Sequence, residues 1–313
     1  EAAGFSGMLF TEGHQVPWMN ITAAALAAPS LHFSTGIAIA FARSPMVTAE
    51  IAWELAQNTG GKFRLGLGSQ VKAHITKRYA SAFDKPAAQM KDYVQAVKAC
   101  LSAFRREAPL HHEGPYYKLS LLTEQWTPPR HAHEDIKVDI SAVGPIMVRV
   151  AGEVADGVHV HPMHSMHSIK HRLLPGLAEG AARAGRDAAG IDKIIPVIVA
   201  AGDAPEERAT AIREAKTTLA FYGATPNYAF QFDDLGYTGL RDQLRDCLKS
   251  GDSERSQALI TDEILDQFAL VARWDDVADR MIERYKGIAS RLVIYLASHC
   301  REVDPKALER WAE

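Results

Sequence analysis

Histidines are the residues of this chain best suited to chemistry, and they are unevenly distributed. Seven of the thirteen fall between positions 131 and 171. Imidazole titrates near neutral pH and ligates zinc, so such a cluster predicts either proton handling or a metal site. The stretch from Val158 to Lys170 contains no aspartate or glutamate to complete a typical zinc site, so no metal is expected. The simpler prediction is a solvated helix face formed by the histidines at helical spacing, namely His164, His167 and His171.

Two turns with glycine have the composition of ligand-binding loops. In "FRLGLGSQ", the alternation of a strand puts three apolar side chains on one face and leaves Gly66 and Gly68 on the other, with no side chain to block a ligand. In "SAVGP", small residues end a strand and Pro145 can open a helix, whose exposed amides favour an anion. Each pattern is also typical of an ordinary packing turn.

Nucleophilic and disulfide chemistry have no local signature in the sequence. No G-x-S-x-G elbow is present, and no C-x-x-C pair or disulfide spacing links Cys100, Cys247 and Cys300. Widely spaced cysteines without a framework are typical of a reducing compartment, so a cytoplasmic location is expected.

Composition and charge exclude several classes of partner. The 313 residues carry a net charge of −3 and are 47% hydrophobic, enough to bury a large core. No lysine or arginine run alternates with aromatic residues, so nucleic acid is not an expected partner. No apolar run approaches the roughly 18 residues of a membrane span. The chain opens at Glu1 without methionine, and part of the natural N-terminus is expected to precede it.

Strand-like and helix-like segments alternate along the chain. Strands are expected at 7–11, 32–40, 63–68, 137–142, 157–161, 194–200 and 291–296. Helices are expected at 20–28, 45–58, 89–106, 145–155, 168–184, 205–222 and 274–286, with a further helical stretch ending near 265. Ser44 and Pro45 are a typical cap and first residue of the second helix.

This alternation predicts an α/β fold with a parallel sheet. A doubly wound sheet and a (β/α)₈ TIM barrel are both compatible with it. Seven strands are visible, and an eighth ahead of Glu1 would complete a barrel. No G-x-G-x-x-G fingerprint follows the first strand, which favours the barrel, whose chemistry lies on the loops after the strands.

The whole chain, residues 1–313, is expected to form one domain, because no linker or low-complexity tract divides it. The stretch 107–135 departs from the repeat: "EGPYYKLS" predicts a small hairpin, and "WTPPRHAHED" an irregular loop. This insertion is either a lid or a plain surface excursion.

Three segments carry a resemblance: "GFSGMLFTEGHQ", "FSTGIAIAFARSPMVTAEIAWELAQNTGGKFRLGLGSQ" and "DISAVGPIMVRVAGEVADGVHVHP". Together they resemble the bacterial luciferase-like flavin and deazaflavin oxidoreductases, most closely the branch that uses coenzyme F420. The resemblance spans about residues 4–296. It implies a (β/α)₈ barrel whose first strand precedes Glu1, a homodimer, cytoplasmic residence, and a hydride-transferring cofactor at the carboxyl ends of the strands.

Residue by residue, the resemblance implies a cofactor site in three parts. A bulge with a non-proline cis peptide at Gly36-Ile37 would lie behind the ring. The tail would be held by a loop after the third visible strand and by a turn after the fourth. The implied cofactor-binding residues are Thr35, Gly36, Ile37, Gly68, Ser69, Gln70, His74, Ala142, Val143 and Gly144.

The implied catalytic residues agree less well with the family. Sugar-phosphate dehydrogenases of this family carry aspartate-histidine after the first of these strands and a glutamate in the glycine loop, where this chain has Glu12-Gly13 and Val71. That activity is therefore not expected. His14, His161 and His74 are candidate proton donors, with a loop histidine bound to a backbone carbonyl as the alternative for His14. Glu12 is either catalytic or fixes its loop by accepting amides.

The resemblance thus predicts a coenzyme F420-dependent oxidoreductase that transfers a hydride between the deazaflavin and a small organic substrate. Two alternatives stay open. One is an FMN-dependent luciferase-like monooxygenase, because family members with either ring share these turns. The other is a flavin-binding relative without turnover, because the best-known catalytic pair is absent.

Overall fold

The computed structural model describes residues 4–295, and the contacts between residues divide the chain into two compact units. The first unit comprises Glu1–Ala142, Ile146–His159 and Leu177–Asp192. The second comprises Val143–Pro145, Val160–Gly176 and Lys193–Glu313. That the whole chain forms one domain stays a prediction.

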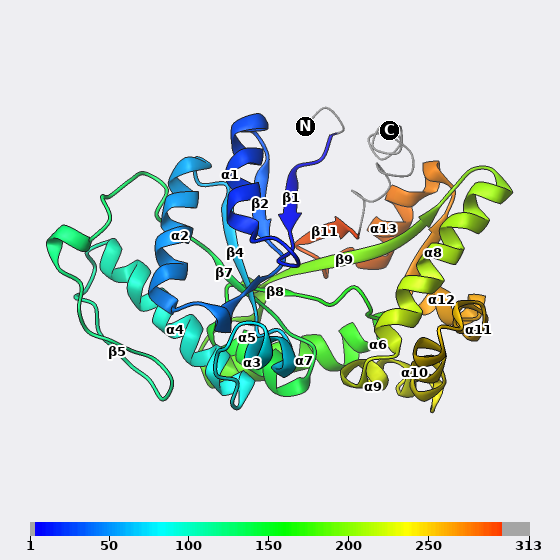
Figure 1. Cartoon of the computed structure of the whole chain (residues 1–313). Coiled ribbons are helices and arrows are strands. Elements are labelled where there is room, and N and C mark those ends of the chain that lie inside the picture. The colour runs from blue at the N-terminus through cyan, green and yellow to red at the C-terminus, as the bar shows by residue number, and fades with distance from the viewer. Residues whose placement is uncertain (1–3, 296–313) are drawn as a thin grey trace. The chain divides into compact units, whose positions relative to one another are not determined.

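Parallel strands form the centre of the first unit (Figure 1). Each pairs in parallel with the next in the order β1, β2, β4, β7, β8, and a short strand β3 also pairs with β4. The strands are β1 (Gly7–Phe10), β2 (His32–Thr35), β3 (Ala38–Ile39), β4 (Phe63–Gly68), β7 (Val138–Ser141) and β8 (Gly157–His159). Parallel neighbours joined by helices confirm the predicted α/β class.

Helices connect these strands along the chain. They are α1 (Pro17–Ala27), α2 (Pro45–Asn58), α3 (Lys72–Lys77), α4 (Pro86–Phe104), α5 (Pro145–Val154) and α7 (Leu174–Arg183), the last two beginning in the second unit. The Ser44 hydroxyl accepts the Val47 amide, which confirms the predicted cap of α2. On α4, Met90, Tyr93 and Val97 recur at helical spacing and are fully buried.

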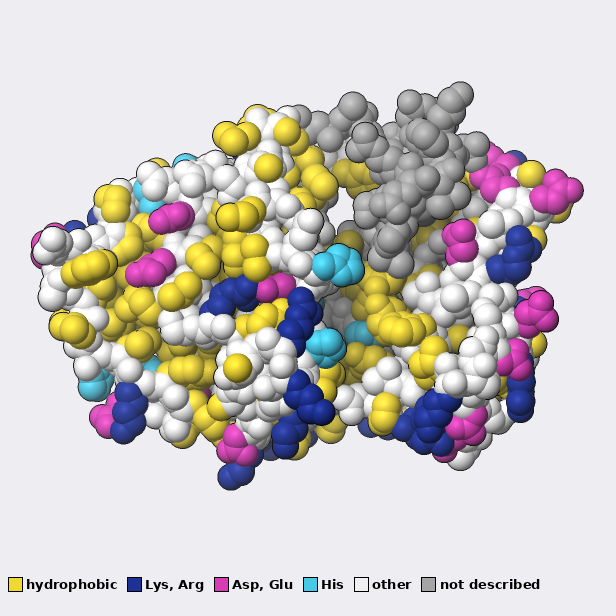
Figure 2. Space-filling view, in the orientation of Figure 1, with side chains coloured by type: hydrophobic (Ala, Val, Ile, Leu, Met, Phe, Trp, Pro, Cys, Tyr) yellow, Lys and Arg dark blue, Asp and Glu magenta, His cyan; other side chains and the backbone are white. Residues whose placement is uncertain are grey.

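Some apolar side chains of this unit remain exposed. Met19 and Leu26 on α1 are 76% and 83% exposed, and Val47 on α2 is 44% exposed. Figure 2 shows hydrophobic side chains gathered over these two helices.

The insertion contains the predicted hairpin, formed by β5 (His112–Glu113) and β6 (Lys118–Leu119) in antiparallel pairing. The buried carboxylate of Asp92 on α4 anchors it, accepting the backbone amides of Tyr116 and Tyr117 at 2.7 and 2.9 Å. Further along, the Trp53 indole donates to the Pro129 carbonyl at 3.0 Å. The segment is thus attached to α2 and α4; its role as a lid stays a prediction.

The second unit is built around β9 (Asp192–Ala201), whose first residue belongs to the first unit. The first half of β9 pairs with β11 (Arg291–Ile294) and the second half with β10 (Ala269–Ala272), both in parallel. Its helices are α6 (Met166–Ser168), α8 (Pro205–Gly223), α9 (Ala229–Asp233), α10 (Leu240–Ser250), α11 (Ser253–Leu259), α12 (Asp262–Phe268) and α13 (Val277–Tyr285).

Several sequence-based boundaries differ from the structure. The strand predicted over 32–40 is divided into β2 and β3 at Gly36 and Ile37. The short elements α3 and β10 were not predicted. The end of the last predicted strand, Leu296, and Cys300 lie outside the described residues. Within the described part of the chain, no helix combines the length and hydropathy that crossing a bilayer requires.

Candidate functional site

The end of β1 holds the backbone of the segment between β2 and β3. The Thr11 hydroxyl donates to the Gly36 carbonyl at 2.9 Å, and the Glu12 amide donates to the Ile37 carbonyl at 3.2 Å. The peptide bond between Gly36 and Ile37 is cis, as the resemblance implied. The two residues predicted to lie behind a cofactor ring are therefore fixed by bonds from the neighbouring strand end.

Glu12 uses both carboxylate oxygens to hold this loop. Its Oε2 accepts the Ile39 amide at 2.8 Å, and its two oxygens accept Nη1 and Nη2 of Arg43 at 2.9 and 2.5 Å. The side chain is buried. These contacts are those of the loop-fixing role offered for Glu12 in the sequence; a catalytic role for it stays a prediction.

His14 lies in the same loop but is exposed. No hydrogen bond of its ring is found within residues 4–295, and the two roles offered for His14 both stay predictions. The loop itself is anchored beside it, because Nη2 of Arg78 donates to the Gly13 carbonyl at 2.8 Å. His14 is thus free to meet a ligand from a fixed backbone.

The space beside Gly66 is filled by protein. A β-carbon there would lie 2.0 Å from the Thr35 carbonyl oxygen and 2.6 Å from Nε2 of His159. The Thr35 hydroxyl is fully buried and bonds both the amide and the carbonyl of Gly66, at 2.9 and 2.7 Å. The prediction that Gly66 clears room for a ligand is therefore wrong: this glycine permits close packing, and Thr35 holds β4 in place.

Gly68 is crowded in the same way, since a β-carbon would lie 2.4 Å from Cδ1 of Ile37 and 2.9 Å from Oγ of Ser141. Beyond it the chain turns outward: Ser69 and Gln70 are half-buried, Gln70 has a φ of 54°, and His74 and Val71 are exposed. The side chains of Ser69, Gln70 and His74 are hydrogen-bonding groups, with no carboxylate among them. This donor set fits the hydroxyls and phosphate of a flavin or deazaflavin tail.

The second predicted turn follows β7. Ala142 is buried, and its amide donates to the His159 carbonyl at 3.3 Å. Val143 and Gly144 belong to the second unit, and a β-carbon at Gly144 would meet nothing within 4 Å. Pro145 opens α5 as predicted. The first turn of this helix leaves backbone amides without intrahelical partners, which suits an anionic group.

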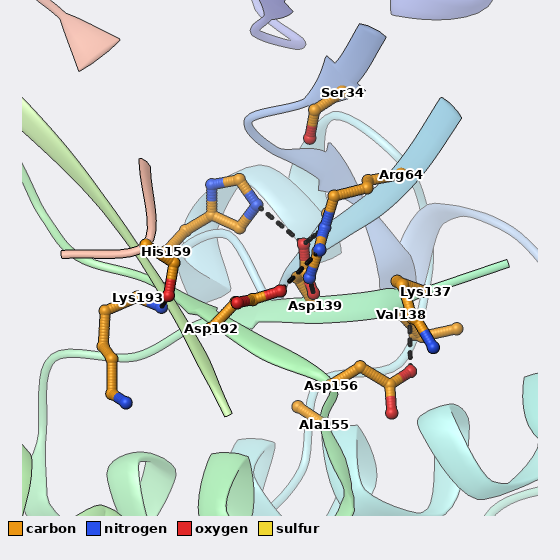
Figure 3. Close-up of polar contacts among 12 residues, drawn as sticks. Ser34, Arg64, Lys137, Val138, Asp139, Ala155, Asp156, His159, Asp192 and Lys193 are labelled. Atoms are coloured by element: carbon orange, nitrogen blue, oxygen red, sulfur yellow. Dashed lines mark hydrogen bonds and ion pairs between the residues drawn. The ribbon is translucent and has the colours of Figure 1, made fainter. Parts of the chain in front are cut away.

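A cluster of charged side chains inside the first unit was not predicted (Figure 3). The Arg64 guanidinium of β4 donates to both oxygens of Asp139 on β7, at 2.8 and 2.6 Å, and to Asp192 at 2.6 Å. His159, at the end of β8, places Nε2 3.7 Å from the Asp139 carboxylate. Burial acts to raise the pKa of Asp139, but its contacts with His159 and Arg64 outweigh burial and lower that pKa.

The signal for this cluster was present in the sequence. Arg64 and Asp139 are charged residues inside short apolar strands, at positions that alternate with the apolar side chains. Charged residues at such positions are almost always paired, so each predicts a partner on a neighbouring strand.

His161 and His164 lie in the loop that follows β8, in the second unit. His161 Nδ1 accepts the Met163 amide at 3.1 Å, while Nδ1 of His164 contacts the His161 carbonyl at 2.9 Å. Nε2 of His164 lies 3.0 Å from the Tyr285 hydroxyl. Burial is the main cause that lowers the pKa of each ring to about 4, and for His161 the neighbouring His164 adds to it.

These positions correct the prediction of a solvated histidine face. His167 and His171 are exposed, with ring centres 4.5 Å apart, but His164 is only 2% exposed. It precedes α6, whose cap is Ser165, so it never joins the helix face. Across the described part of the chain, no three histidine, cysteine or acidic side chains lie together in a way that could hold a metal ion.

Comparison with known proteins defines the class. Residues 1–291 match the luciferase-like monooxygenase family, and the chain belongs to that family. Among its relatives is the uncharacterized protein Rv1360 of Mycobacterium tuberculosis, 35% identical over 309 residues that cover 99% of this chain and 91% of that protein.

Solved structures agree with this assignment. The coenzyme F420-dependent tetrahydromethanopterin reductase from Methanopyrus kandleri superposes with a TM-score of 0.79 at 22% identity, covering 100% of this chain and 90% of the other. A type II Baeyer-Villiger monooxygenase from Pseudomonas putida, in complex with FMN, gives 0.66 at 16% identity, covering 100% and 88%. The fold is therefore the α/β fold of the luciferase-like barrel proteins, as predicted.

Proposed function

We propose that the protein is a coenzyme F420-dependent oxidoreductase acting on a small organic substrate. The motif segments resemble the F420 branch of the family, and the M. kandleri reductase of similar fold is F420-dependent. The observation that carries the proposal is the turn after β4, where the hydrogen-bonding side chains of Ser69, Gln70 and His74 follow a strand end whose backbone is closely packed.

In this proposal the residues divide into holding and reacting groups. Ser69, Gln70 and His74, which all belong to the first unit, bind the tail of the cofactor. Ile37 lies over Gly68 and gives the ring an apolar support. When bound, the deazaflavin supplies or accepts a hydride. The exposed imidazole of His14 is a candidate to exchange a proton with the substrate, because an imidazole can donate or accept one.

The test is the affinity of the purified protein for F420 and for FMN, measured by fluorescence titration. The proposal expects F420 to bind more tightly, and Gln70→Ala to weaken that binding about tenfold through the loss of a hydrogen bond. The matched control is Gln15→Ala, an exposed glutamine after β1. Tight binding of FMN with no binding of F420 would overturn the proposal.

An FMN-dependent monooxygenase is the second candidate, favoured by the fold shared with the FMN-bound enzyme from P. putida. It requires oxygen and a separately reduced flavin. Oxygen consumption with reduced FMN and none with reduced F420 would select it. A cofactor that binds but turns over with no aldehyde, alcohol, enone or imine would instead select the non-catalytic alternative.

The resemblance also suggests a cytoplasmic homodimer. The exposed apolar residues of α1 and α2, Met19, Leu26 and Val47, are the surface we propose for the contact. Analytical ultracentrifugation of the protein and of Leu26→Glu tests it: a dimer that becomes monomeric supports the proposal, and a monomeric unaltered protein contradicts it.

A further inference from the structure

The segment that follows β4 in the first unit is basic and contains no acidic residue. No aspartate or glutamate occurs between Glu54 and Asp84, whereas Lys72, Lys77 and Arg78 lie in α3 or directly after it. The three side chains are exposed. Within residues 4–295, no carboxylate pairs with any of them, so their positive charge is available to an anion that binds from solution.

Two other exposed arginines of the first unit are each neutralised by a neighbouring carboxylate. Arg106 donates to both oxygens of Glu124, at 2.8 and 2.9 Å, and Arg130 is paired with Glu134. A carboxylate that already accepts from a guanidinium leaves it little attraction for a further anion. The contrast identifies the segment after β4 as a surface whose positive charge the protein itself does not compensate.

Arg78 is exposed, yet two contacts hold its guanidinium in place. Its Nη2 donates to the Gly13 carbonyl at 2.8 Å, and its guanidinium carbon lies 5.1 Å from the centre of the Tyr79 ring. A guanidinium has five N–H donors, and within residues 4–295 the bond to Gly13 is the one hydrogen bond found for this group. The remaining donors are therefore oriented in advance for carboxylate or phosphate oxygens, which a guanidinium can bind in pairs.

The spacing of α3 places these cations beside the candidate cofactor loop. Lys77 and Arg78 follow His74 by three and four positions, so the three side chains lie on one face of the helix. Ser69 and Gln70 come just before this helix, directly after the end of β4. A ligand whose tail is bound by the loop and by His74 therefore meets the lysine and the arginine next.

We propose that Lys77 and Arg78 bind the glutamate carboxylates at the end of the F420 tail, and that this basic face makes the protein select F420 over FMN. This inference rests on the proposed F420-dependent function. F420 carries a chain of glutamates beyond its phosphate, whereas FMN ends at the phosphate, so only F420 has anionic groups that extend to both cations. Because the face is exposed, dissolved salt screens the attraction.

Fluorescence titration of the full chain with F420, FMN and a tail-less deazaflavin tests this role. The tail-less compound keeps the ring and ribityl chain of F420 but lacks its phosphate and glutamates. Lys77→Gln should weaken F420 binding about threefold and Arg78→Gln about tenfold, with the affinities for the other two ligands unchanged. In the unaltered protein the Kd for F420 should rise with salt concentration and fall as the glutamate chain is lengthened. The matched control is Lys62→Gln, which removes the same charge at the opposite end of β4 and should change no affinity.

The same titrations separate the possible failures. A protein that binds FMN and no F420 overturns the proposed function and this inference with it. Equal affinity for F420 and the tail-less deazaflavin, or unchanged F420 affinity in both variants, leaves the proposed function standing and overturns the role of the basic face. Arg78 also holds the Gly13 carbonyl, so a variant that loses affinity for all three ligands alike acts through that loop and overturns the contact of Arg78 with the tail. Arg78→Lys keeps the charge without the paired donors and should recover part of the F420 affinity.

Discussion

His159 and His161 are two residues apart at the end of one strand, yet the chain gives them opposite electrostatic surroundings. His159 belongs to the first unit and faces the Asp139 carboxylate, which is bound to Arg64. His161 belongs to the second unit and lies among tyrosine rings, and no carboxylate of residues 4–295 pairs with it. The first region is held by paired charges, and the second excludes charge. Residue type alone therefore predicts neither role, because the neighbours decide it.

The two regions should lose stability in different pH ranges, and this is the largest effect we expect. The folded pKa values of His161 and His164 are about 4, below the usual 6.5, so between these values only the unfolded chain binds their protons. Stability therefore falls as pH falls from 6.5 to 4, by about 3 kcal/mol for each ring. The pKa of Asp139 is lowered from 3.8, so its contribution is lost only below that value.

Urea unfolding followed by circular dichroism at pH 7, 5.5 and 4.5 measures this difference. The variant His164→Leu should lose stability at pH 7 but show a shallower fall between pH 6.5 and 4. The control is the exposed histidine His167: His167→Leu should leave the slope of stability against pH unchanged. An identical slope in the His164 variant would show that the buried ring does not titrate in this range.

The stability of the first unit should depend on each member of its charged cluster. Asp139→Asn leaves the Arg64 guanidinium with the single carboxylate of Asp192, and removing one partner of a buried ion pair costs about 3–5 kcal/mol. Thermal unfolding at pH 7 measures the loss. The surface pair of Lys118 and Glu113 is the control, and Glu113→Gln should have little effect. Equal effects of the two substitutions would mean that the interior cluster is not desolvated.

Gly66 tests whether the first region is packed as tightly as its contacts indicate. Gly66→Ala places a methyl group against the Thr35 carbonyl and the His159 ring, and should cost about 3 kcal/mol. Gly144→Ala is the matched control, because its β-carbon meets nothing and the change should be close to neutral. Chemical denaturation compares the two. A tolerated alanine at position 66 would restore the view that this face is open to a ligand.

The sequence predicted the elements whose signals are local. The bounds of α2 follow from Ser44 and Pro45 at its start, and those of β4 from its apolar alternation and glycines. It missed β10 (Ala269–Ala272), which follows α12 directly with no turn residue between them to mark the boundary. It also placed His164 on a helix face, because the spacing of the histidines is helical although the helix begins only at Met166.

In the candidate site too, local features could be predicted and contacts between distant residues could not. The cis peptide at Gly36-Ile37 was found through resemblance, since its sequence contains no proline to mark it. The pairing of Glu12 with Arg43 joins residues 31 positions apart, and that of Arg64 with Asp139 joins residues 75 apart. Which residues become partners depends on the order of the strands in the sheet, and this order cannot be derived from a single sequence. The conformation of a turn could be predicted, whereas the identity of the group facing it could not.

The smallest effect is expected from removing the stacked ring of Tyr228, which shields His161. Tyr228→Leu removes an aromatic contact worth about 1 kcal/mol and admits water beside the imidazole. The pKa of His161 should therefore rise from about 4 toward its usual 6.5, because desolvation is the main cause of its depression. Tyr228→Phe keeps the ring and should change neither quantity. Proton NMR titration of the histidine signals measures the pKa in both variants. A pKa that stays low in the leucine variant would assign the shielding of His161 to Tyr222 and His164 instead.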